Sequence, residues 1–450
     1  MNRSRRRQNG SSSDLAADTN TAALITTLRK LLPLGLGVKR WLVIGSAGFF
    51  ISATGMAYVL GRVFDLRPPS FLPIAVEAII LMAVGVIVLL LSVYGLLRSL
   101  GPQMFASRDV GHLLENIGSR RTRERGPKIV VIGGGTGLSV LLRGIKQHTD
   151  NITAVVTVAD DGGSSGRLRR EMGVPPPGDF RNCIVALSDS EKLVTDLFQY
   201  RFSQGEGLEG HNFGNLFIVA MVEVTGSFDK ALSESGKVLA VRGQIVPATV
   251  ANVRLSARLI DGRIVTGESN IPLSGAGIEE LFLEPRRPSA HPKAVEAILD
   301  ADIVVMGPGS LFTSILPNLM VPGITKALEE SQATKVYVCN VATQEGETDN
   351  FSVADHVDAL QRHTHEKITD FVIANSHAAD PGTDYGETIV VDDGRSVPYA
   401  TVLHAEIADP EHPVRHSSEG LARAVMSLYH GNRRLRTQQQ RQGSEGLLAG

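Results

Sequence analysis

Aromatic side chains, cysteines and net charge are all scarce in this sequence of 450 residues. Aromatic residues make up 5% of the chain and include one Trp, so no platform for stacking nucleic-acid bases is evident. A formal net charge of −2 also argues against a nucleic-acid partner held by bulk positive charge. The two cysteines, Cys183 and Cys339, lack metal-ligand spacing, and we expect both to be buried thiols.

Charged residues are absent from residues 41–60, and residues 73–97 carry only Glu77. A run of about 20 apolar residues is long enough to cross a bilayer. Two such runs, joined by a short polar loop, predict a transmembrane hairpin instead of a signal peptide. Neither run has a polar face, which disfavours a pair of buried soluble helices. Lys and Arg gather outside the hairpin, so both termini and the large C-terminal part are expected on the cytoplasmic side of the cell membrane.

The rest of the chain divides by composition. Residues 1–40 are basic and are expected to be a partly disordered cytoplasmic N-terminus, and residues 98–127 form a polar linker. Residues 128–430 have the composition of one folded domain. Residues 431–450 are rich in Gln, Arg and Gly, which predicts a disordered tail.

The folded part opens with a buried strand at 128–132, a glycine turn at 133–137, a helix at 138–147 and a strand at 152–159. This order begins a βαβ unit and predicts an α/β fold, a Rossmann-like parallel sheet with helices on both faces. Residues 239–265, with an Asp-Gly turn at 261–262, predict a small β-rich excursion from that sheet. Further strands are expected at 302–306, 335–341 and 371–374, and further helices at 194–200, 214–226 and 294–299.

The glycine turn is the first candidate site. Gly134, Gly135, Thr136 and Gly137 lie between a strand and a helix, where phosphate can approach the backbone and the positive helix N-terminus. The dinucleotide fingerprint is incomplete, because Leu138 stands where its third glycine would be. An NAD-dependent oxidoreductase is therefore disfavoured.

The most informative stretch is 160–182, which combines acids, open backbone and arginines. Asp160 and Asp161 follow a predicted strand and bind Mg²⁺, bind a ribose, or cap the next turn. Residues 177–182 are expected to form a constrained loop that presents Asp179. The anion-binding candidates of this stretch are Ser164, Ser165, Arg167, Arg181 and Asn182. Together these residues indicate a phosphate-rich ligand, most simply a nucleotide.

Three more polar turns follow predicted buried segments, at 210–215, 307–310 and 340–348. In the first, His211 is an acid/base group, a phosphate ligand or a structural histidine, while Asn212 and Asn215 orient a ligand or cap a helix. In the second, Gly307, Gly309 and Ser310 offer another anion site. Turns gathered at the carboxyl ends of parallel strands predict one ligand crevice.

The combined pattern resembles the gluconeogenesis factor (YvcK-type) family. That family lies within the larger CofD-like group that includes 2-phospho-L-lactate transferase of deazaflavin cofactor synthesis. The matching blocks are Gly-Gly-Gly-Thr-Gly at 133–137, Asp-Asp-Gly-Gly-Ser-Ser-Gly-Arg-Leu-Arg at 160–169, Pro-Gly-Asp-Phe-Arg-Asn at 177–182, Gly-His-Asn-Phe-Gly-Asn at 210–215, Pro-Ala-Thr at 247–249 and Gly-Pro-Gly-Ser-Leu at 307–311. Phe312, Ala342 and Glu345 depart from the family pattern.

The resemblance implies a UDP-sugar ligand, such as UDP-N-acetylglucosamine, and a role in cell shape and envelope morphogenesis during gluconeogenic growth. It makes Asp160, Asp161 and Asp179 candidates for Mg²⁺ or substrate contact, and Tyr385 a candidate for the nucleotide side. The leading interpretation is a membrane-tethered, non-catalytic regulator with cell-wall synthesis or kinase partners, in a homo-oligomer. The alternative is a Mg²⁺-dependent transferase of a nucleotide-linked phospho group, with Asp160, Asp161 and His211 as tentative catalytic residues.

Overall fold

The computed structural model describes residues 123–189, 192–376 and 388–448, with Phe49, Phe50, Ala53 and Ala57 from the first apolar run. The predicted N-terminal segment, nearly all of the predicted hairpin, most of the linker and Tyr385 lie outside these residues. Within them, no single helix is both long and apolar enough to cross a membrane. The helical pair Leu311–Leu319 and Pro322–Glu330, bent by 73°, meets the length and composition criteria only when both halves are combined.

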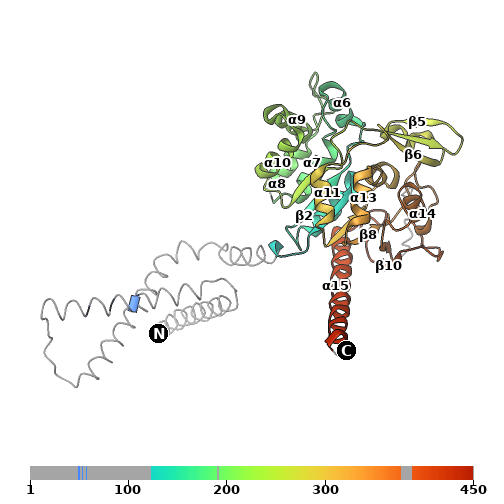
Figure 1. Ribbon diagram of the computed structural model, residues 1–450. Coiled ribbons are helices and arrows are strands. Elements are labelled where there is room, and N and C mark those ends of the chain that lie inside the picture. The colour runs from blue at the N-terminus through green and yellow to red at the C-terminus, as the bar shows by residue number, and fades with distance from the viewer. Residues whose placement is uncertain are drawn as a thin grey trace, which may run out of the picture. The chain divides into compact units, whose positions relative to one another are not determined.

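A seven-stranded parallel sheet forms the centre of the domain, with strand order β10-β9-β8-β7-β1-β2-β3 (Figure 1). Its strands are β1 (Ile129–Gly133), β2 (Ile152–Val156), β3 (Gln244–Pro247), β7 (Ile303–Met306), β8 (Thr334–Val338), β9 (Phe371–Asn375) and β10 (Thr401–Ala405). The five residues of β1 are all buried, as expected for a strand covered on both faces. The predicted Rossmann-like α/β fold is therefore confirmed.

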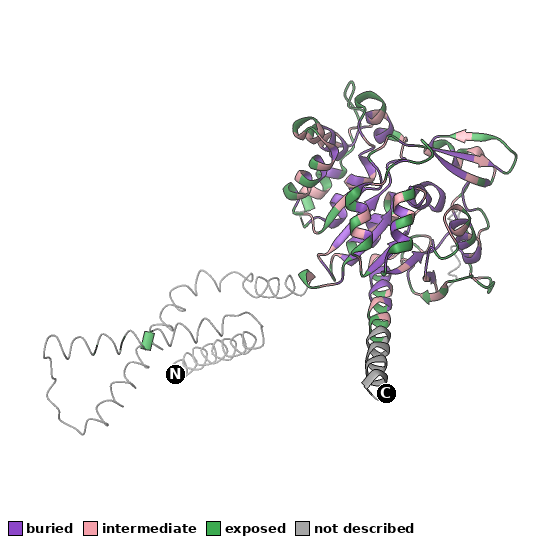
Figure 2. Ribbon diagram, in the orientation of Figure 1, coloured by how far each residue is buried: buried purple, intermediate pink, exposed green. Residues whose placement is uncertain are grey.

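Helices cover both faces of this sheet, and alternate residues of β1 reach two separate cores. Ile129 and Val131 pack with side chains of α5, α7 and α15, whereas Val130 and Ile132 pack with side chains of α11, α13 and α14. Figure 2 shows the strands buried between outer helices with exposed faces. The helices are α5 (Gly135–Ile145), α6 (Gly163–Met172), α7 (Gly178–Leu187), α8 (Lys192–Gln199), α9 (Phe213–Thr225), α10 (Phe228–Val238), α11 (Pro292–Leu299), η3 (Leu311–Ile315), α12 (Leu316–Leu319), α13 (Pro322–Glu330), α14 (Val353–His363) and α15 (Ser418–Leu448).

The β-rich excursion is real but begins later than expected. A separate antiparallel sheet has the order β5-β4-β6, with β4 (Arg254–Leu259), β5 (Ile264–Thr266) and β6 (Ile278–Glu284). Two short 3-10 turns, η1 (Glu268–Asn270) and η2 (Pro272–Ser274), connect β5 to β6. By contrast, β3 pairs in parallel with β2 and is an edge strand of the main sheet.

Two segments predicted as loops are helical. The expected loop at 177–182 is the first turn of α7, where Phe180, Cys183, Ile184 and Leu187 are buried at helical spacing. Most of the stretch after Asp161 is α6, which ends at Gly173 in the left-handed conformation. The structure also continues α15 across 431–448, where composition predicted disorder. Arg, Gln and Leu in this stretch are good helix formers.

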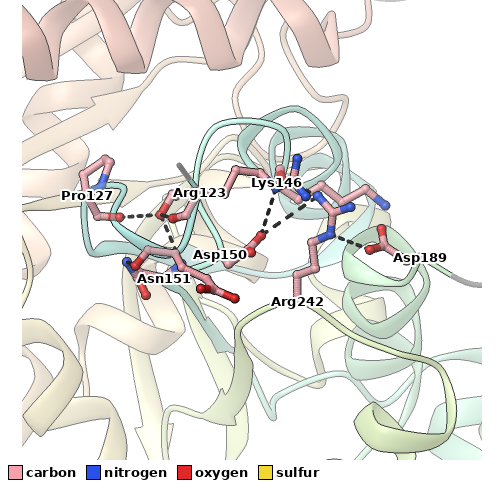
Figure 3. Close-up of polar contacts among 9 residues, drawn as sticks. Arg123, Pro127, Lys146, Asp150, Asn151, Asp189 and Arg242 are labelled. Carbon is pink, nitrogen blue, oxygen red and sulfur yellow. Dashed lines mark hydrogen bonds and ion pairs between the residues drawn. The ribbon is translucent and has the colours of Figure 1, made fainter. Parts of the chain in front are cut away.

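The start of the domain is fixed to the loop between α5 and β2 by a polar cluster, shown in Figure 3. The Arg123 guanidinium pairs with Asp150 at 3.3 Å, and Asn151 donates to the carbonyls of Glu124 and Gly126. Arg242 donates to Asp189 at 2.6 Å and to the Lys146 carbonyl. The chain therefore enters the domain at the amino-terminal edge of the sheet, where β1 begins.

Candidate functional site

The topology of the sheet singles out one position for a ligand. After β1 the chain adds β2 and β3 on one side, then returns to add β7, β8, β9 and β10 on the other. The connections that leave neighbouring strands β1 and β7 therefore run in opposite directions along the sheet. Open α/β sheets bind ligands in the crevice that forms at such a point. A cavity of about 780 Å³ lies there. The sequence prediction of one crevice at the carboxyl ends of the strands is consistent with it.

Residues from all parts of the domain line this cavity. They are Gly134, Gly135, Thr136, Gly137, Ser139, Val140 and Arg143 after β1; Gly309, Ser310, Thr313 and Ser314 after β7; Asn340, Val341, Ala342, Thr343, Gln344 and Glu347 after β8; and Asn182, Gln199, Glu268, Val414, Arg415 and His416 from other segments.

The glycine turn places the start of α5 at the cavity, where the Gly135 amide donates to Asp179. Gly134 occupies the N-cap position in an extended conformation, and neither a capping side chain nor an acidic residue is present in the first turn. The amide groups at this end, and the positive end of the helix dipole, are suited to an anion. Gly135 has a φ of +65°, which glycine adopts without strain.

The turns after β1 and β7 touch backbone to backbone. A Cβ atom on Gly137 would lie 2.6 Å from the Pro308 carbonyl oxygen, and one on Gly309 would lie 3.3 Å from the Gly134 carbonyl oxygen. Side chains at these positions would separate the two turns. The glycines are therefore needed for the cavity floor to close.

A buried hydroxyl–carboxylate network forms part of the wall after β7. The Ser310 hydroxyl donates to Glu347, and the Thr313 hydroxyl contacts the same carboxylate at 3.1 Å. Burial raises the pKa of Glu347, although these hydrogen bonds oppose the rise. Asn340 accepts a hydrogen bond from the Gly309 amide and donates to Gln344, which ties the loop after β8 to the turn after β7.

The predicted acidic residues lie directly behind the glycine turn. A Cβ on Gly134 would be 2.6 Å from a carboxylate oxygen of Asp179, and the backbone of Gly135 donates to that carboxylate. Burial, assisted by the nearby charge of Asp160, raises the pKa of Asp179 to about 6. Burial also raises the pKa of Asp160, which accepts a hydrogen bond from the Gly162 amide at 2.9 Å.

Glu268 is a further acidic residue near these carboxylates, and it lines the cavity. Burial and the charges of Asp160, Asp179, Glu347 and Asp161 raise its pKa to about 8. In the described ranges, no three or more His, Cys, Asp or Glu side chains converge closely enough to hold a metal ion by themselves. Mg²⁺ usually takes only one or two carboxylates and completes its shell with water and phosphate oxygens.

Several predicted site residues instead hold α6 and α9 together. Ser164 contacts the Nδ1 atom of His211 at 3.0 Å and accepts a hydrogen bond from Asn215 at 3.2 Å. Asn212 caps α9 by accepting from the Gly214 amide. Burial and the charge of Arg167 lower the pKa of His211. None of these side chains is among the residues that line the cavity.

Most of the remaining predicted residues also make contacts within the fold, and some of them line the cavity. Ser165 accepts a hydrogen bond from the Gly178 amide at 3.1 Å, and Arg167 donates to the Glu209 carbonyl. Arg181 donates to the side chain of Asn182, which does line the cavity. Gly307 adopts a φ of +84° in the turn after β7. Of the predicted residues within the described ranges, the cavity is thus lined by Gly134, Gly135, Thr136, Gly137, Asn182, Gly309 and Ser310.

Sequence reasoning missed a group of charged and polar residues that line the cavity but lie outside the predicted motifs. Arg143 stands two turns into α5, Gln199 ends α8, and Arg415 and His416 precede α15. Burial lowers the pKa of His416 to about 4, so its imidazole is neutral at pH 7. Of these residues, only Arg143 had a signal in its neighbouring sequence, because it is a positive charge about two turns after the glycine turn.

Comparison with known proteins supports the resemblance found in the sequence. The family model of 2-phospho-L-lactate transferase CofD matches residues 129–418. A relative from Nostoc sp. (strain PCC 7120) is 44% identical over 428 residues, which cover 89% of this chain and 92% of the relative. The gluconeogenesis factor of Halalkalibacterium halodurans is 46% identical, with 66% of this chain and 95% of that protein covered.

Two further matches place the similarity within the folded domain. The gluconeogenesis factor of Bacillus subtilis is 54% identical over 250 residues, covering 56% of this chain and 79% of the relative. A crystal structure of a upf0052 family member from Bacillus halodurans has a TM-score of 0.63 and 44% sequence identity. It covers 67% of this chain and 99% of that chain, so that solved protein consists almost wholly of the part matched here.

Proposed function

This chain belongs to the gluconeogenesis factor family within the CofD-like group, and from that premise we propose that its cavity binds a UDP-sugar. The first candidate ligand is UDP-N-acetylglucosamine. We further propose that the protein is a regulator of envelope precursor supply that works through ligand binding without turnover. Binding would shift a conformational population and thereby a partner interaction.

One observation carries the ligand class: the start of α5, whose N-cap residue is a glycine, meets the turn after β7 at the switch point of the sheet. Amides at the start of α5, with Arg143 and Arg415 on the lining, are suited to phosphate oxygens, whereas the Gly307 and Gly309 amides of the turn after β7 already bond Ile132 and Asn340. A cavity of about 780 Å³ is also within the size range of cofactor and ligand sites.

The surroundings of His211 favour a regulator over an enzyme. Its ring is buried against Ser164, away from the lining of the cavity. His416 does line the cavity, but its lowered pKa leaves it a weak base at neutral pH. Neither histidine is poised as a general base, which needs a pKa near the working pH and a position within reach of the substrate.

The carboxylates favour the second candidate, a Mg²⁺-dependent transferase of a nucleotide-linked phospho group, and the matching family model is described as 2-phospho-L-lactate transferase. One or two of the carboxylates of Asp160, Asp179 and Glu268 would offer oxygen ligands to a cation that binds together with the substrate phosphates. The cation would neutralise charge that develops on the leaving phosphate. The chain's own groups would orient the phosphates and exclude water.

A binding experiment separates these candidates. A fragment of residues 120–450 would be titrated with UDP-N-acetylglucosamine by calorimetry, with and without Mg²⁺, and the same samples would be analysed for products. Tight binding with intact ligand supports the regulator, whereas Mg²⁺-dependent release of UDP or UMP supports the transferase. The absence of binding would refute a UDP-sugar ligand.

A matched pair of variants makes this test specific to the cavity. Arg415→Ala removes a charge from the lining, and Arg287→Ala removes an exposed charge after β6, outside the lining. We expect the first to weaken binding at least tenfold and the second to leave it unchanged. Equal effects would mean that general charge, not the cavity, attracts the ligand.

The cellular part of the proposal rests on the sequence alone. Apolar runs at 41–60 and 73–97 support a membrane tether with both termini in the cytoplasm. The family supports a role in cell shape, with cell-wall synthesis or kinase partners and a homo-oligomeric state. Membrane fractionation of the full chain, compared with a chain lacking residues 1–119, tests the tether: recovery of both forms in the soluble fraction would refute it.

A further inference from the structure

The small antiparallel sheet has one direct connection with the cavity. Strand β5 ends at Thr266, and the chain then turns through η1 and η2 before β6 begins at Ile278. In this connection, residues 267–277, only Glu268 is among the residues that line the cavity. The sheet therefore supplies a single carboxyl group to a site that is otherwise built from the main sheet and its helices.

The connection is held in place on two sides. On one side, the backbone and hydroxyl of Ser269 donate to the same oxygen of Asp161, at 3.0 and 2.8 Å. On the other, a Cβ on Gly346 would lie only 2.0 Å from the Pro272 carbonyl oxygen, so the turn beside Glu347 packs directly on η2. Both contacts flank Glu268, which fixes its carboxyl group at the cavity wall.

Glu268 lies in an acceptor-rich corner. Each charge that acts most strongly on it comes from another carboxylate: Asp160, Asp179, Glu347 and Asp161. The hydroxyls nearest to Glu347, those of Ser310 and Thr313, are already directed at that residue. A sugar hydroxyl that approaches Glu268 can donate to its carboxyl oxygen, which is an acceptor also in the protonated form that the raised pKa favours at pH 7.

The cavity wall formed by α5 and the segment before α15 carries hydrogen-bond donors and positive charge instead. Amides of the glycine turn, Arg143 and Arg415 provide donors and positive charge there. Ser418 donates to the Val140 carbonyl, which places the segment that carries Arg415 against α5. Phosphate oxygens fit this wall, and neutral hydroxyl groups fit the wall formed by Glu268.

We propose that Glu268 is a specificity-determining residue that accepts hydrogen bonds from the hydroxyl groups of the ligand's sugar, so that the cavity distinguishes a nucleotide sugar from the bare nucleotide. This inference rests on the proposed UDP-sugar ligand and adds an orientation to it. The diphosphate lies along α5 and Arg415, and the sugar lies beneath the connection from β5 to β6.

The test compares two ligands on three proteins. Calorimetry of UDP-N-acetylglucosamine and of UDP would be performed on wild-type residues 120–450, on Glu268→Ala and on Glu279→Ala. Glu279 is an exposed acid on β6 and serves as the matched control. Thermal unfolding of each protein checks that the fold is retained.

We expect wild type and Glu279→Ala to bind the nucleotide sugar at least tenfold more tightly than UDP. Glu268→Ala should lose that preference while binding UDP as well as wild type does. An equal loss for both ligands, an unchanged preference, or a loss seen only with Mg²⁺ present would overturn the proposal. If wild type binds neither ligand, the UDP-sugar function itself fails, and this outcome is visible before any variant is measured.

Discussion

Replacing Gly137 by Ala tests whether the turns after β1 and β7 are held in backbone contact. The added methyl group would meet the Pro308 carbonyl oxygen at 2.6 Å and the Gly309 Cα at 2.9 Å. These are backbone atoms, so the turn after β7 has to move as a unit. Overpacking of this kind costs about 1–3 kcal/mol. Alanine regains about 0.5–1 kcal/mol through its helix preference, which leaves a net loss on the order of 1–2 kcal/mol.

Denaturant unfolding of residues 120–450 measures this loss, and calorimetry measures the effect on the ligand. We expect affinity for UDP-N-acetylglucosamine to fall at least tenfold, because separating the two turns displaces the start of α5 from the rest of the cavity wall. The matched control is Gly236→Ala in α10, where the new Cβ would lie at an ordinary 3.6 Å from Val241. That variant should gain about 0.5–1 kcal/mol and bind normally. If Gly137→Ala behaves like the control, the close approach of the two turns is refuted.

Three further predictions concern charge and polar contacts. Since Glu268 has a folded pKa of about 8 against an ordinary 4.5, the native state binds its proton more tightly, and the free energy of unfolding should fall as pH rises between these values, by no more than about 5 kcal/mol. Glu268→Gln should flatten that part of the pH profile of denaturant unfolding. Asp150→Ala should lower the free energy of unfolding by an amount on the order of 1–2 kcal/mol, because Arg123 then loses its partner. Hydrogen exchange at residues 123–127 should also become faster, and exchange as slow as in wild type would contradict this role. His211→Ala should destabilise the domain by about 1–3 kcal/mol, since Ser164 loses a buried contact, and yet leave ligand affinity within threefold; an abolished affinity would return His211 to the binding site.

The strands and the position of the crevice could be predicted because they depend on local pattern. Continuous apolar runs mark β1, β2, β7 and β9, and glycine or polar turns follow several of them. The edge strand β10 was missed. Its residues are half exposed, so it lacks the apolar run that marked the inner strands.

The helices α6 and α7 were misjudged because glycine, serine and proline were interpreted as loop signals. In α7 the helical spacing of Phe180, Cys183 and Ile184 was present in the sequence and was the better guide. Composition likewise favoured disorder after Gly431, but no proline follows Gly431 before residue 448, and α15 continues past Gly443 and Gly446.

The candidate site could be predicted only where it is made of consecutive residues. The glycine turn and Ser310 are examples, because strand ends place them at the crevice directly. Glu268, Arg415 and His416 reach the cavity through tertiary contacts, and nothing in their neighbouring residues indicates this. Conversely, Ser164 and Asn212 have the residue types of a binding site but contribute to contacts between helices.

The polar cluster around Arg123 and Asp150 has a practical consequence for how the domain can be handled. It fixes the start of the domain at the edge of the sheet where strands begin, while the cavity lies at the edge where they end. A domain immobilised on a sensor chip through a tag at residue 120 would therefore be attached at the edge opposite its cavity. Surface-based kinetics should then agree with solution affinities, and immobilisation through Glu279 or other residues of the small sheet should slow ligand access instead.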